Sequence, residues 1–504
     1  MFAILFTLFT VVAFSYYIRF RRSRRRLYEL AAKLPGPFDL PLIGSIHVAF
    51  RRDPSEILDY LIKHLHNLTT PLRAWLGPFL FVVIDQPEHL AIVLNSQDCI
   101  KRASVYHFVG LEKGVFNAAP DLWRKLRKQL NPSFAVPALK SFVPTFNEKA
   151  DLLVKNLECM VGEKPFDILY QASEYMLATS AINSLGLDMD DDSNYKKRYL
   201  KNAEQMFTLV MNRILKVWLY PDFIYKLTSS YREEMNRRDM FQGVSKRVFS
   251  MRKEARQKSS KSATTAERDE TNARRPQLFI DKLEDIANKT GILDEDGVIQ
   301  NLDTFIFASN DTTSAAVAIT VLMLAMHPDV QERLFQEVIN TVPGSYIDYD
   351  DLSKLAYLEM VIKEAIRLFP IVPAVARLCE KEFQVGDFII PVNAQIGIPV
   401  IKINRNKEVW GEKSEQFDPE NFSAENCAKR HPYAYLSFSG GIRNCIGIKY
   451  AMIAIKIGLI KLIKSYTLST ELSLADLKFH YSIVMRISNG LVSLERRETQ
   501  VSHS

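Results

Sequence analysis

The amino-acid sequence predicts a mainly α-helical protein with a minor β region and an N-terminal transmembrane anchor. Three observations lead to this fold class. The first 18 residues carry no charged side chain and are followed by a cluster of arginines. Long stretches with helical periodicity and few glycines or prolines fill most of the remaining chain. Two short segments with strand-like composition, 72–94 and 383–391, lie far apart in the sequence.

The uncharged N-terminal segment predicts a helix that spans a membrane. A bilayer is crossed by about 17 to 20 apolar residues in a helix, and residues 1–20 supply them. Six arginines between residues 19 and 26 then hold this end on the cytoplasmic side. A cleaved signal peptide or a mitochondrial presequence would place its basic residues before or within the apolar helix. We therefore expect a retained anchor over residues 1–20 and a basic, proline-rich connector over residues 21–45.

The two strand-like segments predict a small sheet. In 72–94 a turn at Gly77-Pro78 separates two strands, and a helix begins near Pro87. In 383–391 a turn at Gly386-Asp387 indicates a hairpin. Helical periodicity covers the remaining long stretches, which are residues 121–130, 145–161, 195–227 and 298–340.

A charged, Ser/Thr-rich stretch, 252–277, is nearly free of large apolar side chains and predicts a mobile surface loop. A linker between two domains is the alternative interpretation. We favour the loop, because the strand-like segments on its two sides fit one sheet. Residues 46–504 are accordingly expected to form a single domain.

Composition narrows the possible functions. The five cysteines are far apart and odd in number, which argues against a disulfide framework and favours a reducing compartment. The chain contains no CxxC pair and no HExxH motif, so it shows no zinc signature. The net charge of +7 is concentrated in the N-terminal arginines, without aromatic interleaving, and gives no reason to expect nucleic-acid binding.

One motif surrounds Cys445, which stands in a glycine-rich loop before a predicted helix. Its spacing is Phe438-x-x-Gly441-x-Arg443-x-Cys445-x-Gly447. Three further stretches precede this motif. They are Trp123 with Arg127 four residues later, ASNDTT at residues 308–313 in a long apolar helix, and Glu364-x-x-Arg367.

These four stretches, in this order, resemble the cytochromes P-450, the haem-thiolate monooxygenases, essentially from end to end. The anchor and connector resemble those of the microsomal members. HPYAYLSFSGGIRNCIGIKYAM and FIFASNDTTS are most similar to the insect branch of the family-4 clan. The resemblance implies the cytochrome P-450 fold, with a long central helix over the haem, and residues 46–504 as one haem-binding catalytic domain.

The resemblance implies that Cys445 is the axial ligand of the iron of haem b. A thiolate ligand pushes electron density onto iron and favours O–O cleavage. By the same resemblance, Phe438 shields the sulfur from water. Gly441 and Gly447 let the backbone approach the sulfur and the macrocycle closely. An inert buried cysteine is the alternative for Cys445, but it does not explain the spacing.

A second set of residues is implied to bind the haem propionates. The planar guanidinium of Arg443 can donate two parallel hydrogen bonds to one carboxylate. By analogy with the family, the propionates are also bound by Trp123, Arg127 and Arg377. For Trp123 and Arg127 the alternative roles are an ordinary packed aromatic ring and a solvated charge.

Asp311 and Thr312 correspond to the family's oxygen-activation pair. The helix opens there over the haem, and a hydroxyl relays protons to the distal oxygen. The alternative is that Thr312 simply donates a hydrogen bond to a carbonyl of its own helix. Ser309 stands where a glycine is common. Its side chain is expected to narrow the opening of the helix over the haem or to change its polarity.

Glu364 and Arg367 are implied to be a buried structural pair without a catalytic role. In the family this pair locks the segment 418–422 onto the proximal side of the haem. Two departures alter its surroundings, since Asn421 stands where an arginine is usual and Asn404 where a histidine is common.

Ala308 stands where many relatives in the clan carry a glutamate that is esterified to the haem. An alanine cannot form this ester, so covalent attachment through position 308 is not expected. Strict terminal hydroxylation of fatty acids is correspondingly less firmly implied.

The resemblance implies a monooxygenase that inserts one oxygen atom of O2 into a fatty acid, hormone or xenobiotic. The apolar pocket is expected to be lined by residues 103–120, Phe305–Ala308 and Ile371–Ala376. No dinucleotide or flavin fingerprint of the GxGxxG type is present. Electrons are therefore expected from NADPH through a flavoprotein reductase, with cytochrome b5 as a possible further partner. The implied location is the endoplasmic reticulum membrane, with the catalytic domain on the cytosolic face.

Three other functions remain open at this point. A peroxide-rearranging isomerase of the same family would need no reductase, but the presence of Asp311 and Thr312 argues against it. A membrane-anchored haem sensor or carrier would have no use for that pair beside the thiolate. A structural membrane protein would contain no haem.

Overall fold

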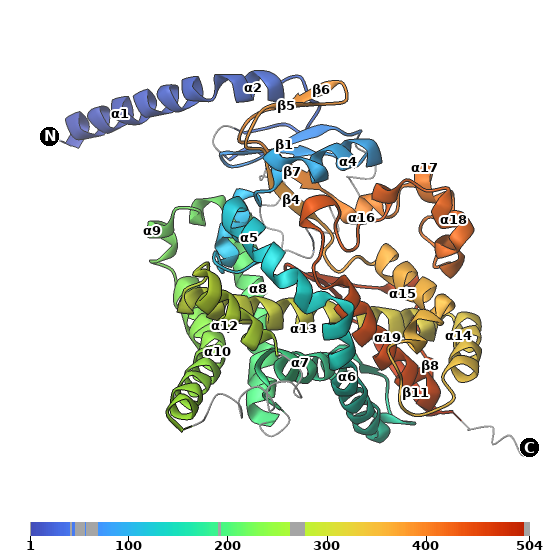
Figure 1. Ribbon diagram of the computed structural model, residues 1–504. Coiled ribbons are helices and arrows are strands. Elements are labelled where there is room, and N and C mark those ends of the chain that lie inside the picture. Colours follow the sequence, from blue (N-terminus) through green and yellow to red (C-terminus); the bar gives the residue numbers. More distant parts are fainter. Residues whose placement is uncertain are drawn as a thin grey trace, which may run out of the picture.

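The structure of the protein is a computed structural model that describes residues 2–40, 43–45, 56, 69–189, 193–262 and 278–497 (Figure 1). Helices form most of it, which confirms the predicted mainly α fold with a minor β region. The helices of the body that exceed ten residues are α5 (Pro120–Leu130), α6 (Val136–Leu157), α7 (Leu169–Leu185), α8 (Ser193–Leu215), α10 (Ser229–Ser262), α12 (Phe279–Thr290), α13 (Glu295–Met326), α14 (Pro328–Thr341), α15 (Ala356–Leu368) and α19 (Ile448–Ser465).

Helix α13 passes through the middle of the body (Figure 1). Most of its residues are buried, because apolar and small side chains occur on every side of it. The Asp294 side chain caps its start by accepting a hydrogen bond from the Gly297 N–H at 2.8 Å. The helix ends at Met326, since Pro328 disfavours helical backbone in the residue before it. The helical stretch predicted over 298–340 is therefore two helices, α13 and α14.

Helix α7 packs closely along α13. Its buried contact face is rich in small residues, including Ala178, Ser180 and Ala181, which let two helix backbones approach. The hydroxyl oxygens of Ser180 and Ser309 lie 2.7 Å apart and join the two helices by a hydrogen bond. This contact holds Ser309, which lines an interior cavity, against α7.

A four-stranded sheet lies at the end of the molecule from which the N-terminal helix projects (Figure 1). Its order is β1 (Leu72–Leu76), β2 (Phe79–Val83), β7 (Gln395–Ile398) and β4 (Val375–Leu378). Strands β2 and β7 are parallel, with Phe81 opposite Gln395. Segments more than 300 residues apart therefore meet in one sheet, but the predicted segment 383–391 is not part of it and forms a separate two-stranded sheet. Helix α4 (Pro87–Asn95) follows β2, and β5 (Phe383–Val385) with β6 (Phe388–Ile390) forms the predicted hairpin.

The remaining strands come mainly from the C-terminal part of the chain. Strand β11 (Leu491–Arg496) lies between β3 (Phe166–Asp167) and β8 (Tyr466–Ser469), and β9 (Phe479–Tyr481) pairs with β10 (Met485–Ile487). The β9–β10 hairpin is not marked by any turn motif in the sequence. The short helices are α9 (Asp222–Tyr225), α16 (Val400–Ile403), α17 (Lys407–Trp410) and α18 (Ala424–Ala428).

Helix α1 (Phe2–Ser23) projects from the body (Figure 1). Most of its described large apolar side chains are exposed, and Ile4–Ser23 is long and apolar enough to span a membrane. Glu295–Met326 passes the same test of length and composition, but it is the largely buried core helix α13. Of these two apolar helices, α13 is buried and α1 is exposed, so α1 is the candidate anchor.

The predicted connector is partly helical. Helix α2 (Arg25–Ala31) follows α1, and Leu27, Leu30 and Ala31 are buried. Tyr28 stacks on Trp75 of β1 with ring centroids 4.9 Å apart. The chain is thus attached to the sheet before its proline-rich part, because leucines occur at helical spacing within the basic segment.

Two further elements differ from the sequence-based prediction. The helix predicted over 195–227 is interrupted, and Pro221 separates α8 from the short α9. Helix α10 continues to Ser262, where a loop was predicted from residue 252, because residues such as Arg, Lys, Glu and Ala favour helix. The rest of that predicted loop, 263–277, lies outside the described residues.

Candidate haem-binding site

A cavity of about 690 Å³ lies between the Cys445 loop and α13. Its walls are predominantly apolar, and all three segments predicted to line it contribute to them. Among the described residues that line it, the only charged ones are Arg102, Arg127 and Arg443, and none is acidic. The cavity therefore combines an apolar interior with an excess of positive charge on its wall.

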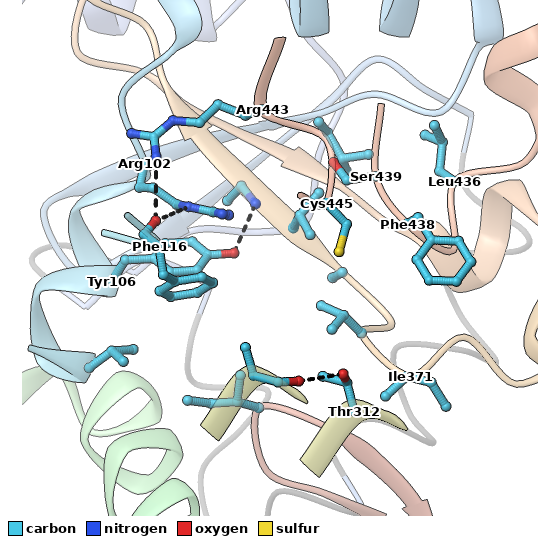
Figure 2. Close-up of a pocket in the computed structure, with 18 of the residues that line it drawn as sticks. Arg102, Tyr106, Phe116, Thr312, Ile371, Leu436, Phe438, Ser439, Arg443 and Cys445 are labelled. Atoms are coloured by element: carbon cyan, nitrogen blue, oxygen red, sulfur yellow. Dashed lines mark hydrogen bonds between the residues drawn. The ribbon is translucent and has the colours of Figure 1, made fainter. Parts of the chain in front are cut away.

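The Cys445 loop directs a sulfur atom into this cavity. The Cys445 N–H donates to the Phe438 carbonyl oxygen at 3.0 Å, which closes the loop, and α19 begins at Ile448. Figure 2 shows the sulfur pointing away from the loop towards the wall formed by Thr312. The exposed surface of Cys445 faces the cavity, so the sulfur is enclosed by the protein yet available to a ligand within it.

The glycines of the motif have different local roles. Gly441 has φ +65°, and a Cβ atom there would lie 2.1 Å from the Leu94 carbonyl oxygen. Only glycine fits such a position. At Gly447 a Cβ atom would meet the Cys445 sulfur and the Phe134 ring at 3.9 Å, an ordinary contact. Gly441 is thus required because the Cys445 loop packs against the backbone of α4 at this position.

The electrostatics of Cys445 are set by opposing effects. Burial raises the pKa of the Cys445 thiol, while the Gly447 N–H and the positive charge of Arg127 lower it. Burial is the largest effect, so the polypeptide alone favours the neutral thiol. A bound metal ion reverses this preference, because a coordinating thiol is deprotonated outright.

Arg443 is buried and lies over the Trp123 ring, 4.4 Å from its centroid. Its guanidinium donates to backbone carbonyls, at 3.0 Å to Ile100 and at 2.8 Å to Ala118. Burial, followed by repulsion from neighbouring arginines, lowers the pKa of Arg443 to about 8. Arg443 therefore anchors the segment before α5 and adds charge to a cluster of cations.

Arg127 and Arg102 complete the charged wall. Arg127 donates to both the backbone and the side-chain oxygen of Asn444, at 2.9 and 2.8 Å, and so holds the residue before Cys445. Arg102 donates through Nε to the Phe116 carbonyl oxygen at 3.0 Å and lies over the Phe116 ring (Figure 2). No residue in the described part of the chain accepts a hydrogen bond from its two Nη atoms. Sequence reasoning missed Arg102, because no motif surrounds it.

Arg377 is buried behind this wall and is not among the residues that line the cavity. It contacts the Ser439 hydroxyl at 3.4 Å, and burial together with Arg102 lowers its pKa to about 9. Four arginines thus crowd together here, and none of them forms an ion pair with a described acidic residue. Such an arrangement suits a ligand that carries carboxylates.

The wall opposite Cys445 is formed by α13 (Figure 2). Thr312, Ser309 and Ala308 line the cavity there. The Thr312 hydroxyl donates to the Ala308 carbonyl oxygen at 2.6 Å, and the Ser309 hydroxyl donates to the Phe305 carbonyl oxygen at 2.7 Å. Both hydroxyls therefore bond to their own helix, which is the alternative that the sequence left open for Thr312.

Asp311 does not line the cavity, although its neighbour Thr312 does. It is buried and forms an ion pair with Arg486 of β10. Burial raises the pKa of Asp311, and Arg486 partly opposes this effect. The predicted pair is thus divided between two faces of α13, and its joint role in oxygen activation stays a prediction.

Glu364 and Arg367 form a fully buried, bidentate ion pair on α15, with N–O distances of 2.7 and 2.8 Å. Arg367 also donates to the carbonyl oxygens of Asn404 and Ser414 at 2.8 and 2.7 Å. Asn421 donates to Glu364 at 3.0 Å. An asparagine amide therefore occupies the place expected for an arginine and still satisfies the carboxylate.

Asn404 connects this pair to the Cys445 loop. Its side-chain oxygen accepts a hydrogen bond from the Leu436 N–H at 3.1 Å, and its amide donates to the Ser437 hydroxyl at 2.9 Å. Arg430 lies nearby, over the Trp410 ring at 3.7 Å. The two departures from the family pattern therefore preserve a continuous hydrogen-bonded support beneath the loop.

A cysteine sulfur, an adjoining cluster of cations and a facing helix around an apolar cavity together define a haem-thiolate protein. These residues match the chemistry of a haem, because the cysteine could supply a thiolate to its iron and the arginines could bind its two carboxylates. The sequence model of one protein family, described as Cytochrome P450, matches residues 34–494. The chain therefore belongs to the cytochrome P450 family and is a P450 monooxygenase, as its motifs predict.

The curated relatives agree with this assignment and with the predicted insect family-4 likeness. The chain is 30% identical over 493 residues to cytochrome P450 4c3 of Drosophila melanogaster, covering 94% of this chain and 90% of the relative. It is 31% identical over 481 residues to cytochrome P450 4c21 of Blattella germanica, covering 94% and 95%. It is 29% identical over 499 residues to probable cytochrome P450 313a4 of Drosophila melanogaster, covering 97% and 99%.

Proposed function

We propose that the protein inserts one oxygen atom of O2 into an apolar substrate, with electrons from NADPH delivered by a flavoprotein reductase. Cytochrome b5 is proposed as a further partner. The observation that carries this proposal is the apolar cavity with the Cys445 sulfur on one wall and the Thr312 hydroxyl on the other. A lipid, hormone or foreign compound with a long apolar part fits such a cavity.

The cofactor is proposed to be haem b, bound without a covalent link through position 308. Cys445 would hold the iron, Phe438 would shield the sulfur, and the arginine wall with Trp123 would bind the carboxylates. A thiolate-bound haem activates O2 for insertion into C–H bonds. Ala308 lines the cavity but offers only a methyl group. Acidified organic solvent should therefore extract all haem from the protein, and haem retained by the polypeptide would contradict this part.

The residues of the polypeptide divide the remaining tasks. The apolar walls, including Phe305, Ile371 and Ile483, exclude water and orient the substrate. Thr312 would hold a proton at its hydroxyl on the side where oxygen binds. Glu364 and Arg367 keep the Cys445 loop in place through Asn404.

The protein is proposed to reside in the endoplasmic reticulum membrane, held by residues 1–20, with residues 46–504 as one catalytic domain on the cytosolic face. The exposed apolar surface of α1 and the arginines that follow it support this orientation. The attachment of α2 to the sheet would keep the catalytic domain close to the bilayer.

A carbon monoxide difference spectrum of the reduced protein tests the thiolate ligand. The wild type should show the Soret shift of a thiolate-bound haem, and Cys445→Ala should lose it. Cys427→Ala, at an exposed cysteine outside the cavity, is the matched control and should keep it. A wild-type spectrum without this shift would refute the proposal.

The reaction itself is tested with purified reductase, NADPH and a panel of fatty acids, steroids and xenobiotics. We expect NADPH-dependent O2 consumption with formation of a hydroxylated product. Rearrangement of a peroxide in the absence of reductase would instead identify an isomerase. A normal spectrum without O2 consumption would indicate a haem sensor or carrier.

A further inference from the structure

Two tyrosine side chains from distant parts of the chain line the interior cavity. Tyr106 lies in the short 3-10 helix Ser104–Val109, and Tyr481 is the last residue of β9. No residue in the described part of the chain accepts a hydrogen bond from either hydroxyl. Each tyrosine therefore presents a hydrogen-bond donor to a cavity whose walls are predominantly apolar.

Three hydroxyls on the α13 wall of the cavity differ from the tyrosines in this respect. Those of Thr304, Ser309 and Thr312 donate to carbonyl oxygens of their own helix at 2.6, 2.7 and 2.6 Å. These three groups are satisfied without a ligand. A hydroxyl whose hydrogen has no acceptor in the protein is instead available to a molecule inside the cavity.

Tyr106 is held in place by contacts that leave its hydroxyl hydrogen unused. The Ala376 N–H donates to the hydroxyl oxygen at 3.4 Å, and the Asn117 amide donates to the Tyr106 carbonyl oxygen at 3.0 Å. The ring packs near Phe116, with centroids 5.8 Å apart, and the Arg102 guanidinium lies 5.1 Å from its centroid. Figure 2 shows the hydroxyl directed into the cavity. Because its oxygen already accepts one hydrogen bond, its hydrogen is left for a ligand.

Tyr481 is held at the cavity wall through both strands of its hairpin. Alternate residues of a strand face the same side, so Tyr481 shares a face with Phe479. Phe479 stacks on the buried Phe369, with centroids 5.7 Å apart. On the other strand, Met485 stands opposite Tyr481, and its N–H donates to the Ile371 carbonyl oxygen at 2.8 Å. The Tyr481 hydroxyl is thus carried by a fixed element.

The surroundings of the two hydroxyls favour an uncharged partner. Burial raises the pKa of Tyr481, and the nearby Tyr106 raises it further, so Tyr481 stays a neutral donor. The charged lining residues, Arg102, Arg127 and Arg443, all belong to the arginine wall, where the haem carboxylates are proposed to bind. A neutral acceptor oxygen on the substrate therefore suits the tyrosines best.

We propose that Tyr106 and Tyr481 are specificity-determining residues that bind an uncharged carbonyl oxygen of the substrate, such as that of an ester or a ketone. This inference rests on the proposed monooxygenase function and narrows its substrates to apolar molecules with such an oxygen. Entry into the cavity removes water from the carbonyl and from both hydroxyls, and hydrogen bonds between them replace it. A hydrocarbon of the same length leaves both hydroxyls unpaired and binds more weakly.

The first test titrates the full-length holoprotein with methyl laurate and with tetradecane in the same detergent, and follows the Soret band. Tyr481→Phe and Tyr106→Phe remove a hydroxyl but keep the ring. Each should weaken the binding of methyl laurate by up to about tenfold, which is what one neutral hydrogen bond contributes, and leave the Kd of tetradecane unchanged. The double variant should show the largest loss of preference for the ester.

Tyr466 of β8 supplies the matched control. Its hydroxyl donates to the Val154 carbonyl oxygen at 2.8 Å, and its side chain does not line the cavity. Tyr466→Phe should leave both Kd values unchanged. If Tyr106→Phe and Tyr481→Phe bound methyl laurate as tightly as this control does, the proposal would be wrong.

Two further outcomes would assign the hydroxyls to other partners. If Tyr106→Phe altered the haem content and the carbon monoxide spectrum but not the Kd of methyl laurate, the hydroxyl would bind a haem carboxylate. If laurate bound more tightly than its methyl ester and lost this affinity in both variants, the ligand group would be anionic. Either result would overturn the proposed role.

The second test identifies the products formed from methyl laurate with reductase and NADPH. A bound carbonyl fixes which carbon of the chain faces Cys445, so the wild type should hydroxylate mainly one region of the chain. Tyr481→Phe should spread the products over more positions, and an unchanged distribution would contradict the role of Tyr481. A wild type without the thiolate-type spectrum would refute the proposed function, whereas a normal spectrum with equal ester affinity in all variants would refute only the role of the tyrosines.

Discussion

At Gly441 the conformation of a single residue decides whether the Cys445 loop can form. Two costs arise at this position, the positive φ and the collision with the Leu94 carbonyl oxygen. Gly441→Ala should destabilise the protein by at least about 2 kcal/mol, since a left-handed conformation alone costs about 1–2 kcal/mol for an L-residue. Thermal unfolding and the carbon monoxide spectrum of the purified variant measure the effect.

Gly162→Ala is the control that separates these two costs. Gly162 has φ +73°, but nothing lies within 4 Å of a Cβ atom built there. Its substitution should cost only about 1 kcal/mol and leave the haem spectrum intact. Equal losses in the two variants would show that the contact with α4 does not constrain the Cys445 loop.

The buried pair on α15 gives a second prediction for single residues. Glu364→Gln would leave the Arg367 charge buried without its carboxylate, which typically costs about 3–5 kcal/mol. We expect a large drop in Tm and loss of the thiolate-type spectrum, because Arg367 supports the Cys445 loop through Asn404. Glu415→Gln removes a half-exposed carboxylate that pairs with Arg405, which keeps its hydrogen bonds to the Leu368 carbonyl oxygen, and should cost only about 1 kcal/mol. A Glu364→Gln variant as stable as this control would contradict the supporting role.

Among the elements, α1 is the one whose removal should leave the body unchanged. Its apolar side chains are exposed, whereas the first buried contacts of the chain come from Leu27 and Leu30 of α2. Deleting residues 2–20 should move the protein from the membrane fraction to the soluble fraction with the same carbon monoxide spectrum and Tm. Cell fractionation measures the first outcome, and unfolding of the purified protein measures the second.

The control for this deletion keeps the helix and removes a contact that follows it. Arg26→Gln breaks the ion pair between α2 and Glu382, at 2.9 Å, without changing the apolar segment. This variant should stay in the membrane fraction. A truncated protein that also stays there would show that a surface other than α1 binds the membrane.

Whether a feature could be predicted from the sequence depends on how local its cause is. The Cys445 motif was recognisable because its glycines, arginine and cysteine lie within ten residues and their spacing follows from one loop. The hairpin at residues 383–391 was predictable for the same reason. The four-stranded sheet was foreseen only as an assembly of distant segments, since strand order depends on packing that no single segment encodes.

The parts of the site that the sequence did not reveal arise between distant segments. Arg102 reaches the cavity wall because its segment bridges to the strand that carries Arg377. Arg486 meets Asp311 across 175 positions of the chain. An isolated arginine carries no periodicity or spacing, so its partner emerges only when the whole chain folds. The division of Asp311 and Thr312 between two faces of α13 likewise depends on what packs against each face.

For the whole molecule, Asp303 should contribute to the pH dependence of stability. This acid is buried between α10 and α13. The Ser245 hydroxyl donates to it at 2.6 Å, and Oδ2 has no partner among the described residues. Burial raises the pKa of Asp303 to about 7. The folded state therefore binds this proton more tightly than the unfolded state, whose aspartate pKa is about 3.9.

The sign of the effect follows from this difference in proton affinity. The contribution of Asp303 to stability is fully present below about pH 4 and is lost as the pH rises to about 7, by at most about 4 kcal/mol. Asp303→Asn should remove this dependence, so that the variant unfolds at a higher temperature than the wild type at pH 8 but not at pH 5. Asp285→Asn, which breaks an exposed pair with Lys289, is the control and should follow the wild-type curve. If Asp303→Asn followed that curve as well, the acid would titrate equally in both states and the contact between α10 and α13 would not govern the pH response.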